Sequence, residues 1–256
     1  MTAVFDSHCH FDDPRFDADR DAVLARAQAG GIDHIVVPGV SASTWRRTRR
    51  ICAAHRSLHP AFGLHPYFIA QHGREDVEAL RDWVRVEKPV AVGECGLDYY
   101  LPERDLRAQR NVFEQQLEIA AEFGLPVIVH ARRAVDDVIA ALKRHPGLRA
   151  DIHSFAGSEV QARRLVDMGA MLGIGASVQF DRAQRLRRIV TDLPLSSLLV
   201  ETDAPDQPGP DRRGQRNEPL FVAKVVACIA DLRGISWDAV AEQTRSNALE
   251  LFAIHA

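Results

Sequence analysis

Three runs of consecutive aliphatic residues constrain the fold of this chain more than any other feature. They are Ile35-Val36-Val37, Val127-Ile128-Val129 and Leu198-Leu199-Val200. A strand with one face in water alternates apolar and polar residues, whereas a strand covered on both faces is apolar throughout. Strands of the second kind are typical of parallel sheets with helices packed on both sides. The sequence therefore favours an α/β fold.

Further β-rich runs and longer segments with helical periodicity alternate along the rest of the chain. The expected strands are Val4–Asp6, Ile35–Val37, Ala61–Gly63, Val90–Gly93, Val127–His130, Asp151–His153, Met171–Ile174 and Leu198–Thr202. The expected helices are Asp17–Ala29, Ser43–Ala54, Arg74–Val86, Arg104–Phe123, Val135–Lys143, Ser158–Met168, Asp181–Thr191, Glu218–Leu232 and Ser236–Phe252. Ser43 and Ser158 stand where N-caps are expected, and Gly124 and Gly169 follow helices.

Eight strands that alternate with helices in a chain of 256 residues predict a (β/α)8 TIM barrel with its site at the carboxyl ends of the strands. No internal repeat or linker divides the chain, so we expect residues 1–256 to form a single domain. An open doubly wound sheet is the alternative, but no Gly-x-Gly-x-x-Gly motif follows any expected strand. The Pro- and Gly-rich segment Ala204–Arg216 follows the last strand, where an active-site loop is expected.

Composition excludes several classes of protein. No apolar run approaches the ~18 residues of a membrane span and no signal-peptide pattern precedes the first strand, so we expect a cytoplasmic protein with no membrane contact. Cys9, Cys52, Cys95 and Cys228 are scattered, which indicates reduced thiols rather than disulfides or a thiolate zinc site. The net charge of −3 gives no general attraction to nucleic acid, so any phosphate binding has to be local. We expect no obligate protein partner.

Residues able to bind metal gather where the expected strands end. His8 and His10 follow the first strand two residues apart, and four more such residues end strands four, five, six and eight: Glu94, His130, His153 and Asp203. Four imidazoles and two carboxylates exceed what one tetrahedral ion needs, and they suffice for two ions that share a bridging carboxylate. We expect Glu94 to be that bridge. Mixed nitrogen and oxygen ligands suit Zn, Mn, Fe or Co better than Mg alone.

The motifs around these positions resemble those of the TatD family of metal-dependent deoxyribonucleases, within the wider amidohydrolase-like superfamily. The matching stretches occur in the family's order over nearly the whole chain: Asp6-Ser7-His8-Cys9-His10-Phe11-Asp12, Gly63-Leu64-His65-Pro66, Val92-Gly93-Glu94-Cys95-Gly96-Leu97-Asp98, His130-Ala131-Arg132, His153-Ser154-Phe155-Ala156-Gly157 and Leu199-Val200-Glu201-Thr202-Asp203-Ala204-Pro205. The resemblance implies that two divalent ions (Mg, Mn or Zn) are bound by His8, His10, Glu94, His130, His153 and Asp203. It also implies DNA as the substrate.

Hydrolysis of a DNA phosphodiester by a water that two cations activate fits these residues best. Glu94 and Asp203 are the expected catalytic residues, with Asp203 as general base. Arg132 is expected to grip a phosphate, and His65 to contact the phosphate or the leaving group. Glu201 and Asp6 are expected to orient the ligands.

Other readings of the same ligand set remain open. Such a centre can hydrolyse an aminoacyl-tRNA ester, a phosphotriester, an amide or a lactone. Cyclic-amide enzymes of this kind use a carbamylated lysine at strand four, where this chain has Glu94. A structural protein with a relic metal site is the non-enzymatic alternative, and it would need closed coordination.

Overall fold

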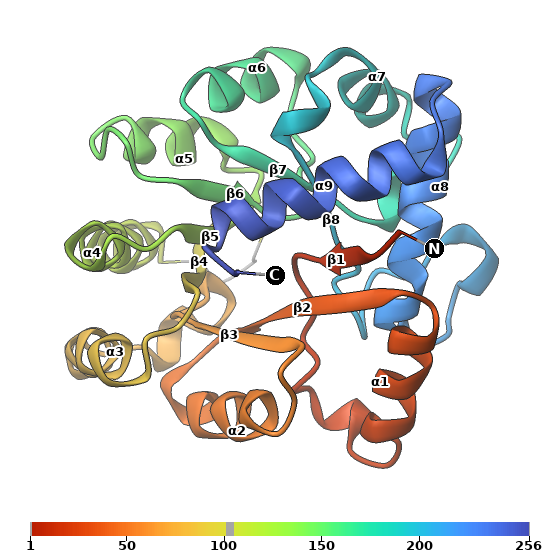
Figure 1. The fold of residues 1–256 in the computed structure, drawn as a ribbon. Coiled ribbons are helices and arrows are strands. Elements are labelled where there is room, and N and C mark those ends of the chain that lie inside the picture. The colour runs from red at the N-terminus through yellow and green to blue at the C-terminus, as the bar shows by residue number, and fades with distance from the viewer. Residues whose placement is uncertain (1, 101–104, 256) are drawn as a thin grey trace.

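The computed structural model describes residues 2–100 and 105–255. Eight strands form one sheet in the order of the sequence, every neighbouring pair is parallel, and a helix follows each strand (Figure 1). Two backbone hydrogen bonds join the first strand to the last: Ser7 N donates to Val200 O at 3.0 Å, and Asp203 N donates to His8 O at 2.9 Å. The TIM-barrel prediction is therefore confirmed.

All eight strands lie where the sequence predicts them; β1 and β7 have the predicted bounds, and the bounds of the other six differ. The strands are β1 Val4–Asp6, β2 Ile32–Gly39, β3 Leu58–Phe62, β4 Ala91–Asp98, β5 Val127–Arg132, β6 Ala150–Ile152, β7 Met171–Ile174 and β8 Leu198–Val200. The helices are α1 Arg20–Ala29, α2 Ala42–Ala53, α3 Arg74–Glu87, α4 Leu106–Phe123, α5 Val135–Leu142, α6 Glu159–Asp167, α7 Gln184–Asp192, α8 Val222–Arg233 and α9 Trp237–Leu251.

The ends of several elements can be compared with those that the sequence predicts. The N-cap of α2 is Ser41, not the expected Ser43. Ser158 caps α6 as predicted, because its hydroxyl accepts from Gln161 N while the Gln161 side chain returns a bond to Ser158 N. Asp105 caps α4 through Ala108 N, whereas the expected start at Arg104 lies outside the described residues. The last two strands that carry site residues are shorter than expected, so those residues follow β6 and β8 rather than ending them.

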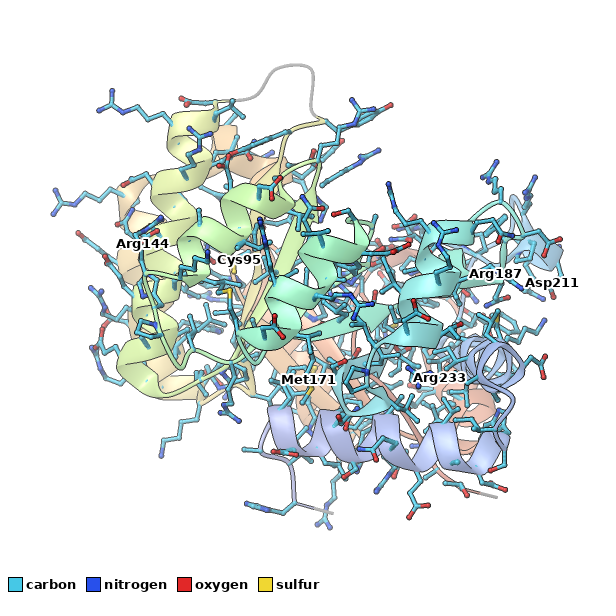
Figure 2. The ribbon with its side chains drawn as sticks, turned by 90° about the horizontal axis from the view of Figure 1, so that it is seen from above. Cys95, Arg144, Met171, Arg187, Asp211 and Arg233 are labelled. Carbon is cyan, nitrogen blue, oxygen red and sulfur yellow. The ribbon has the colours of Figure 1, made fainter. Side chains whose placement is uncertain are left out.

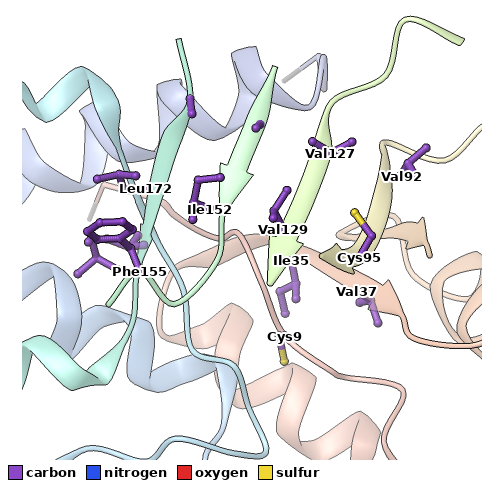
Figure 3. Close-up of a cluster of buried hydrophobic side chains, with 14 of the residues drawn as sticks. Cys9, Ile35, Val37, Val92, Cys95, Val127, Val129, Ile152, Phe155 and Leu172 are labelled. Atoms are coloured by element: carbon purple, nitrogen blue, oxygen red, sulfur yellow. The ribbon is translucent and has the colours of Figure 1, made fainter. Parts of the chain in front are cut away.

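Two hydrophobic layers hold the barrel together. The larger one lies between the strands and the surrounding helices and includes Val92, Val129 and Leu172 (Figure 3). The smaller one fills the barrel interior with one side chain from each of six strands and with the end of α9: Phe5, Val36, Ala61, Ala91, Ile128, Leu199, Ala248, Leu251 and Phe252. Helix α9 crosses this end of the barrel (Figure 1). This layer and α9 therefore close the barrel interior at the amino ends of the strands, and a site is expected at the carboxyl ends.

The cysteines are free thiols as expected, and Cys9, Cys52 and Cys95 are buried. In Figure 2, Cys95 lies inside the molecule, while Asp211 on the loop after β8 lies at its edge. Within residues 2–100 and 105–255, no helix combines the length and the apolar character that a membrane crossing requires.

Candidate active site

The structure brings the six predicted ligands together at the carboxyl ends of the strands. Four of their atoms form one compact set: Nε2 of His8, Nε2 of His10, Oε2 of Glu94 and Oδ1 of Asp203. Five of the six distances within this set are between 3.3 and 3.7 Å. Corners of a tetrahedron with a radius of about 2.1 Å, the usual zinc–ligand distance, lie about 3.4 Å apart. Within the described part of the chain, Glu94 Oε2 is buried without a hydrogen-bond partner. This set therefore fits a divalent cation.

The second oxygen of Glu94 faces a different pair of imidazoles. Glu94 Oε1 lies 3.2 Å from Nδ1 of His130 and 3.0 Å from Nε2 of His65. The side chain of Glu94 is only 2 % exposed. One carboxylate thus joins two ligand sets, which is the geometry expected of a bridge between two ions.

His153 lies on the other side of the first set. Its ring stacks on His8 with 3.5 Å between centroids, and its Nε2 is 3.7 Å from Asp203 Oδ2. Its Nδ1 is 3.0 Å from Glu201 Oε1, and Ser154 N donates to that same oxygen at 2.7 Å. His8, His153 and Glu201 form a third group whose ligand atoms lie within 4.8 Å of one another.

Hydrogen bonds at the far ring nitrogens distinguish His130 from His65. The Nε2 atom of His130 is 3.0 Å from Asp98 Oδ2, so a proton on Nε2 leaves the Nδ1 lone pair facing Glu94 and the metal position. In His65 the arrangement is reversed, because Tyr67 N donates to Nδ1 at 3.0 Å. Neutral His65 therefore carries its proton on Nε2 and donates it to Glu94 Oε1. His130 can act as a ligand in this state, whereas His65 orients the carboxylate.

The electrostatics of the metal-free centre are dominated by Glu94. Burial alone would raise the pKa of Glu94, but the surrounding histidines, first His65 and His8, hold it well below its usual range. Burial opposes the charge on His10, yet Glu94 and Asp203 raise its pKa to about 9. Without metal, the ligand atoms of the centre thus hold protons in the positions where they would otherwise bind cations. Metal binding at neutral pH is therefore expected to release protons.

Two carboxylates, Asp6 and Glu201, are buried beneath the ligands that we expect them to orient. Asp6 accepts from Thr202 N at 2.9 Å and from Thr202 Oγ1 at 2.6 Å, which ties β8 to β1 beneath the site. Burial raises the pKa of Asp6 to about 8 despite these bonds. Glu201 occupies the barrel interior only because β7 has Gly173 there, since a Cβ at that position would lie 2.3 Å from Glu201 Oε2.

The sequence interpretation assigned no role to three residues at the site. Asp98 orients His130, and its position four residues after Glu94 on one strand is a signal that could have revealed it. Asp151 is fully buried next to Glu201, and burial together with that charge raises its pKa well above its usual range. Gln207, on the loop after β8, donates to Asp203 Oδ2 at 2.5 Å. Only the folded chain reveals the last two contacts.

The centre opens onto a cavity of about 1300 Å3, and the lining includes His65, Glu94, Arg132, Asp203 and Gln207. Arg132 is exposed there, and its guanidinium lies 3.8 Å from the centroid of the Tyr100 ring. No carboxylate among residues 2–100 and 105–255 makes an ion pair with it. Ligands at the strand ends of a barrel, facing an accessible cavity, define the class of metal-dependent hydrolases.

Comparison with known proteins also indicates a metal-dependent hydrolase, and it identifies the family. The family model described as TatD related DNase matches residues 5–253. The chain is 38 % identical to the metal-dependent hydrolase YjjV of Escherichia coli K12 over 97 % of each protein, and 34 % identical to the metal-dependent hydrolase YabD of Bacillus subtilis over 98 % of this chain and all of that one. The crystal structure of YjjV superposes with a TM-score of 0.94 over 98 % of each chain. The chain belongs to the TatD family, and it is a metal-dependent hydrolase.

Proposed function

We propose that this hydrolase is a phosphodiesterase that cleaves single-stranded DNA with two divalent ions. The observation that carries the proposal is the position of Glu94: its Oε2 faces His8 and His10, and its Oε1 faces His130. A centre built around such a bridge and open to a large cavity suits an extended substrate with a charged reacting group. A closed structural site would have no such opening.

Two divalent ions, held by His8, His10, Glu94, His130, His153 and Asp203, would lower the pKa of a water and neutralise the phosphate oxygens. The remaining roles belong to the chain's own side chains. Asp203 accepts the proton of the attacking water, and Gln207 holds the carboxylate in place. Arg132 binds a phosphate oxygen through its guanidinium fork. His65, beside Glu94, contacts the phosphate or the leaving group when its Nε2 is released from Glu94 Oε1.

The names of two relatives support nucleic acid as the substrate. The proteins of Klebsiella pneumoniae and Erwinia amylovora that are 32 % and 34 % identical to this chain are both named 3'-5' ssDNA/RNA exonuclease TatD. Each is matched over 98 % of this chain. We therefore expect hydrolysis of single strands, with RNA as a second substrate to be tested.

A substrate panel tests this proposal. Single-stranded DNA, single-stranded RNA, an abasic duplex, an aminoacyl-tRNA, a phosphotriester and a dihydropyrimidine are incubated with the metal-loaded enzyme. We expect cleavage of the single strands, its loss in Asp203→Asn, and wild-type rates in Asp181→Asn, a control on an exposed carboxylate of the loop after β7. Turnover of another compound with no phosphodiester cleavage would refute the proposal. Anomalous scattering from crystals soaked with a nucleotide would identify the ions.

A further inference from the structure

Exposed aromatic side chains are unusual, and here one lines the cavity while a second lies against an arginine of its lining. Among the described residues, the large hydrophobic side chains that remain exposed include two aromatic ones, Tyr67 at 61 % and Tyr100 at 49 %. Tyr67 lines the cavity, and Tyr100 stacks on Arg132, which also lines it. Leaving such rings in water is unfavourable, so exposed aromatics concentrated at a site indicate a ligand surface.

Tyr100 holds two cations at this edge. The guanidinium of Arg132 is 3.8 Å from its ring centroid and that of Arg133 is 4.7 Å away. Both arginines are exposed and line the cavity, and no carboxylate within the described ranges pairs with either. Stacking on the ring fixes the guanidiniums without neutralising them, so they keep their charge for an anion.

On the opposite side of the cavity the arginines among the described residues are paired with carboxylates: Arg47, which lines it, contacts Asp17. Asp12, Asp13 and Asp206 lie there, and Arg15 is neutralised by two of these carboxylates. The guanidinium of Arg15 makes a paired contact with Asp206 at 2.7 and 2.8 Å and lies 3.0 Å from Asp13. Asp136 and Asp137 also line the cavity near Arg132 and Arg133, but Asp137 is paired with Arg110. This side therefore keeps an excess of positive charge, which attracts an anionic strand.

The aromatic and cationic residues are neighbours in the barrel. Tyr67 follows β3, Tyr100 follows β4, and the two arginines lie at the end of β5. The rings of His65, which follows β3, and His130, on β5, have centroids only 4.5 Å apart. We call Tyr67, Tyr100, Arg132 and Arg133 the β3–β5 rim; it continues directly from the Glu94 centre.

We infer that the β3–β5 rim binds the nucleotides next to the scissile phosphodiester, with Tyr67 stacking on a base and the arginines on Tyr100 holding a neighbouring phosphate. The inference rests on the proposed function and adds a strand path to it. A base stacks on an aromatic ring whatever its identity, so this binding is independent of sequence. The faces of a base inside a duplex are already covered by its neighbours, so Tyr67 favours single strands.

Binding to a fluorescein-labelled dT8 strand tests the inference, measured by anisotropy in EDTA so that no turnover occurs. We expect Tyr67→Ala to weaken binding about tenfold and Tyr67→Phe to bind like the wild type, because stacking does not need the hydroxyl. We expect Arg133→Gln to weaken binding several-fold and to reduce the slope of log Kd against log salt by about 0.7. Arg163→Gln, an exposed arginine on α6 away from the cavity, is the matched control.

The rim and the proposed function fail in different ways. If the wild type cleaves dT8 with metal, while Tyr67→Ala and Arg133→Gln bind and cleave it like Arg163→Gln, the rim is refuted and the function stands. If the variants weaken binding as expected but metal-loaded wild type does not cleave the strand, the rim stands and the nuclease proposal is refuted. If wild type neither binds nor cleaves dT8, both are refuted.

Discussion

Replacing Asp98 by Asn tests how the second ligand set is oriented. The carboxylate of Asp98 is an acceptor on both sides: Oδ1 takes the N–H of Tyr100 at 2.8 Å, and Oδ2 takes the Nε2 proton of His130 at 3.0 Å. Asparagine keeps the shape but has only one acceptor oxygen. If that oxygen stays on Tyr100 N, the amide group donates to His130 Nε2. The proton of His130 then moves to Nδ1, and the lone pair that faces Glu94 is lost.

The expected cost follows from the role of such supporting carboxylates. Loss of a group that orients a metal-binding histidine typically weakens metal affinity about 10- to 100-fold, or about 1.4 to 2.7 kcal/mol. The loss falls on the set that contains His130, because the tetrahedral set of His8, His10, Glu94 and Asp203 does not contact Asp98 in the described structure. Affinity for one ion therefore drops while that for the other is kept.

Calorimetric titration of the metal-free protein with Mn2+ or Zn2+ measures this. In Asp98→Asn we expect the dissociation constant of one of the two metal-binding steps to rise 10- to 100-fold. Hydrolysis should recover in excess metal. Asp105→Asn is the control, because an asparagine N-cap serves α4 as well as the aspartate does. Wild-type affinity at both steps, or an equal loss at both, would show that Asp98 does not set the His130 tautomer.

Three further predictions follow from the site and from the closed end of the barrel. His130→Ala and Asp203→Ala should abolish most metal-dependent hydrolysis while circular dichroism shows an intact fold, and wild-type turnover in either variant would contradict their assignment. Chelation should stop hydrolysis and lower the Tm, and a metal at 100 times its Kd should restore about 2.7 kcal/mol of stability; an unchanged Tm would argue against a bound ion. The third prediction concerns His59. Burial, and then the neighbouring His34, whose Nδ1 is 2.9 Å from His59 Nε2, lower the pKa of His59 from 6.5 to about 4. Below pH 6.5 the unfolded chain binds a proton at His59 that the folded chain does not. The contribution of neutral His59 to the free energy of unfolding is therefore complete above pH 6.5 and is lost as the pH falls towards 4. After allowance for partial exposure we expect a loss of about 2 kcal/mol. Urea unfolding measures this loss: between pH 7 and pH 4.5, the free energy of unfolding should fall less in His59→Leu than in the wild type. An equal fall in both proteins would exclude His59 as the cause.

Much of the fold could be predicted because its signals are local in the sequence. Apolar runs such as Val127-Ile128-Val129 mark buried strands regardless of what packs on them. His130 keeps the period of two from Ile128, a residue of the barrel interior, so its direction into the site could be predicted too. The helix starts were less certain: Ser43, the expected cap of α2, lies inside the helix, and Ser41 takes the N-cap position without a capping hydrogen bond from its side chain.

The order of the ligands along the chain and their place in or just after the strands were determined by the sequence itself. Tertiary structure decided where their side chains point. Ala91 fills the barrel interior, so strict alternation would turn Glu94, three residues later, outwards; an irregularity between Val92 and Cys95 in the pairing with β5 reverses the faces and brings Glu94 to the centre. The hydrogen bond from His130 Nε2 to Asp98 likewise sets which ring nitrogen of His130 is free. Strand pairing and hydrogen bonding of this kind depend on neighbours that are distant in the sequence, and a local pattern carries no information about them.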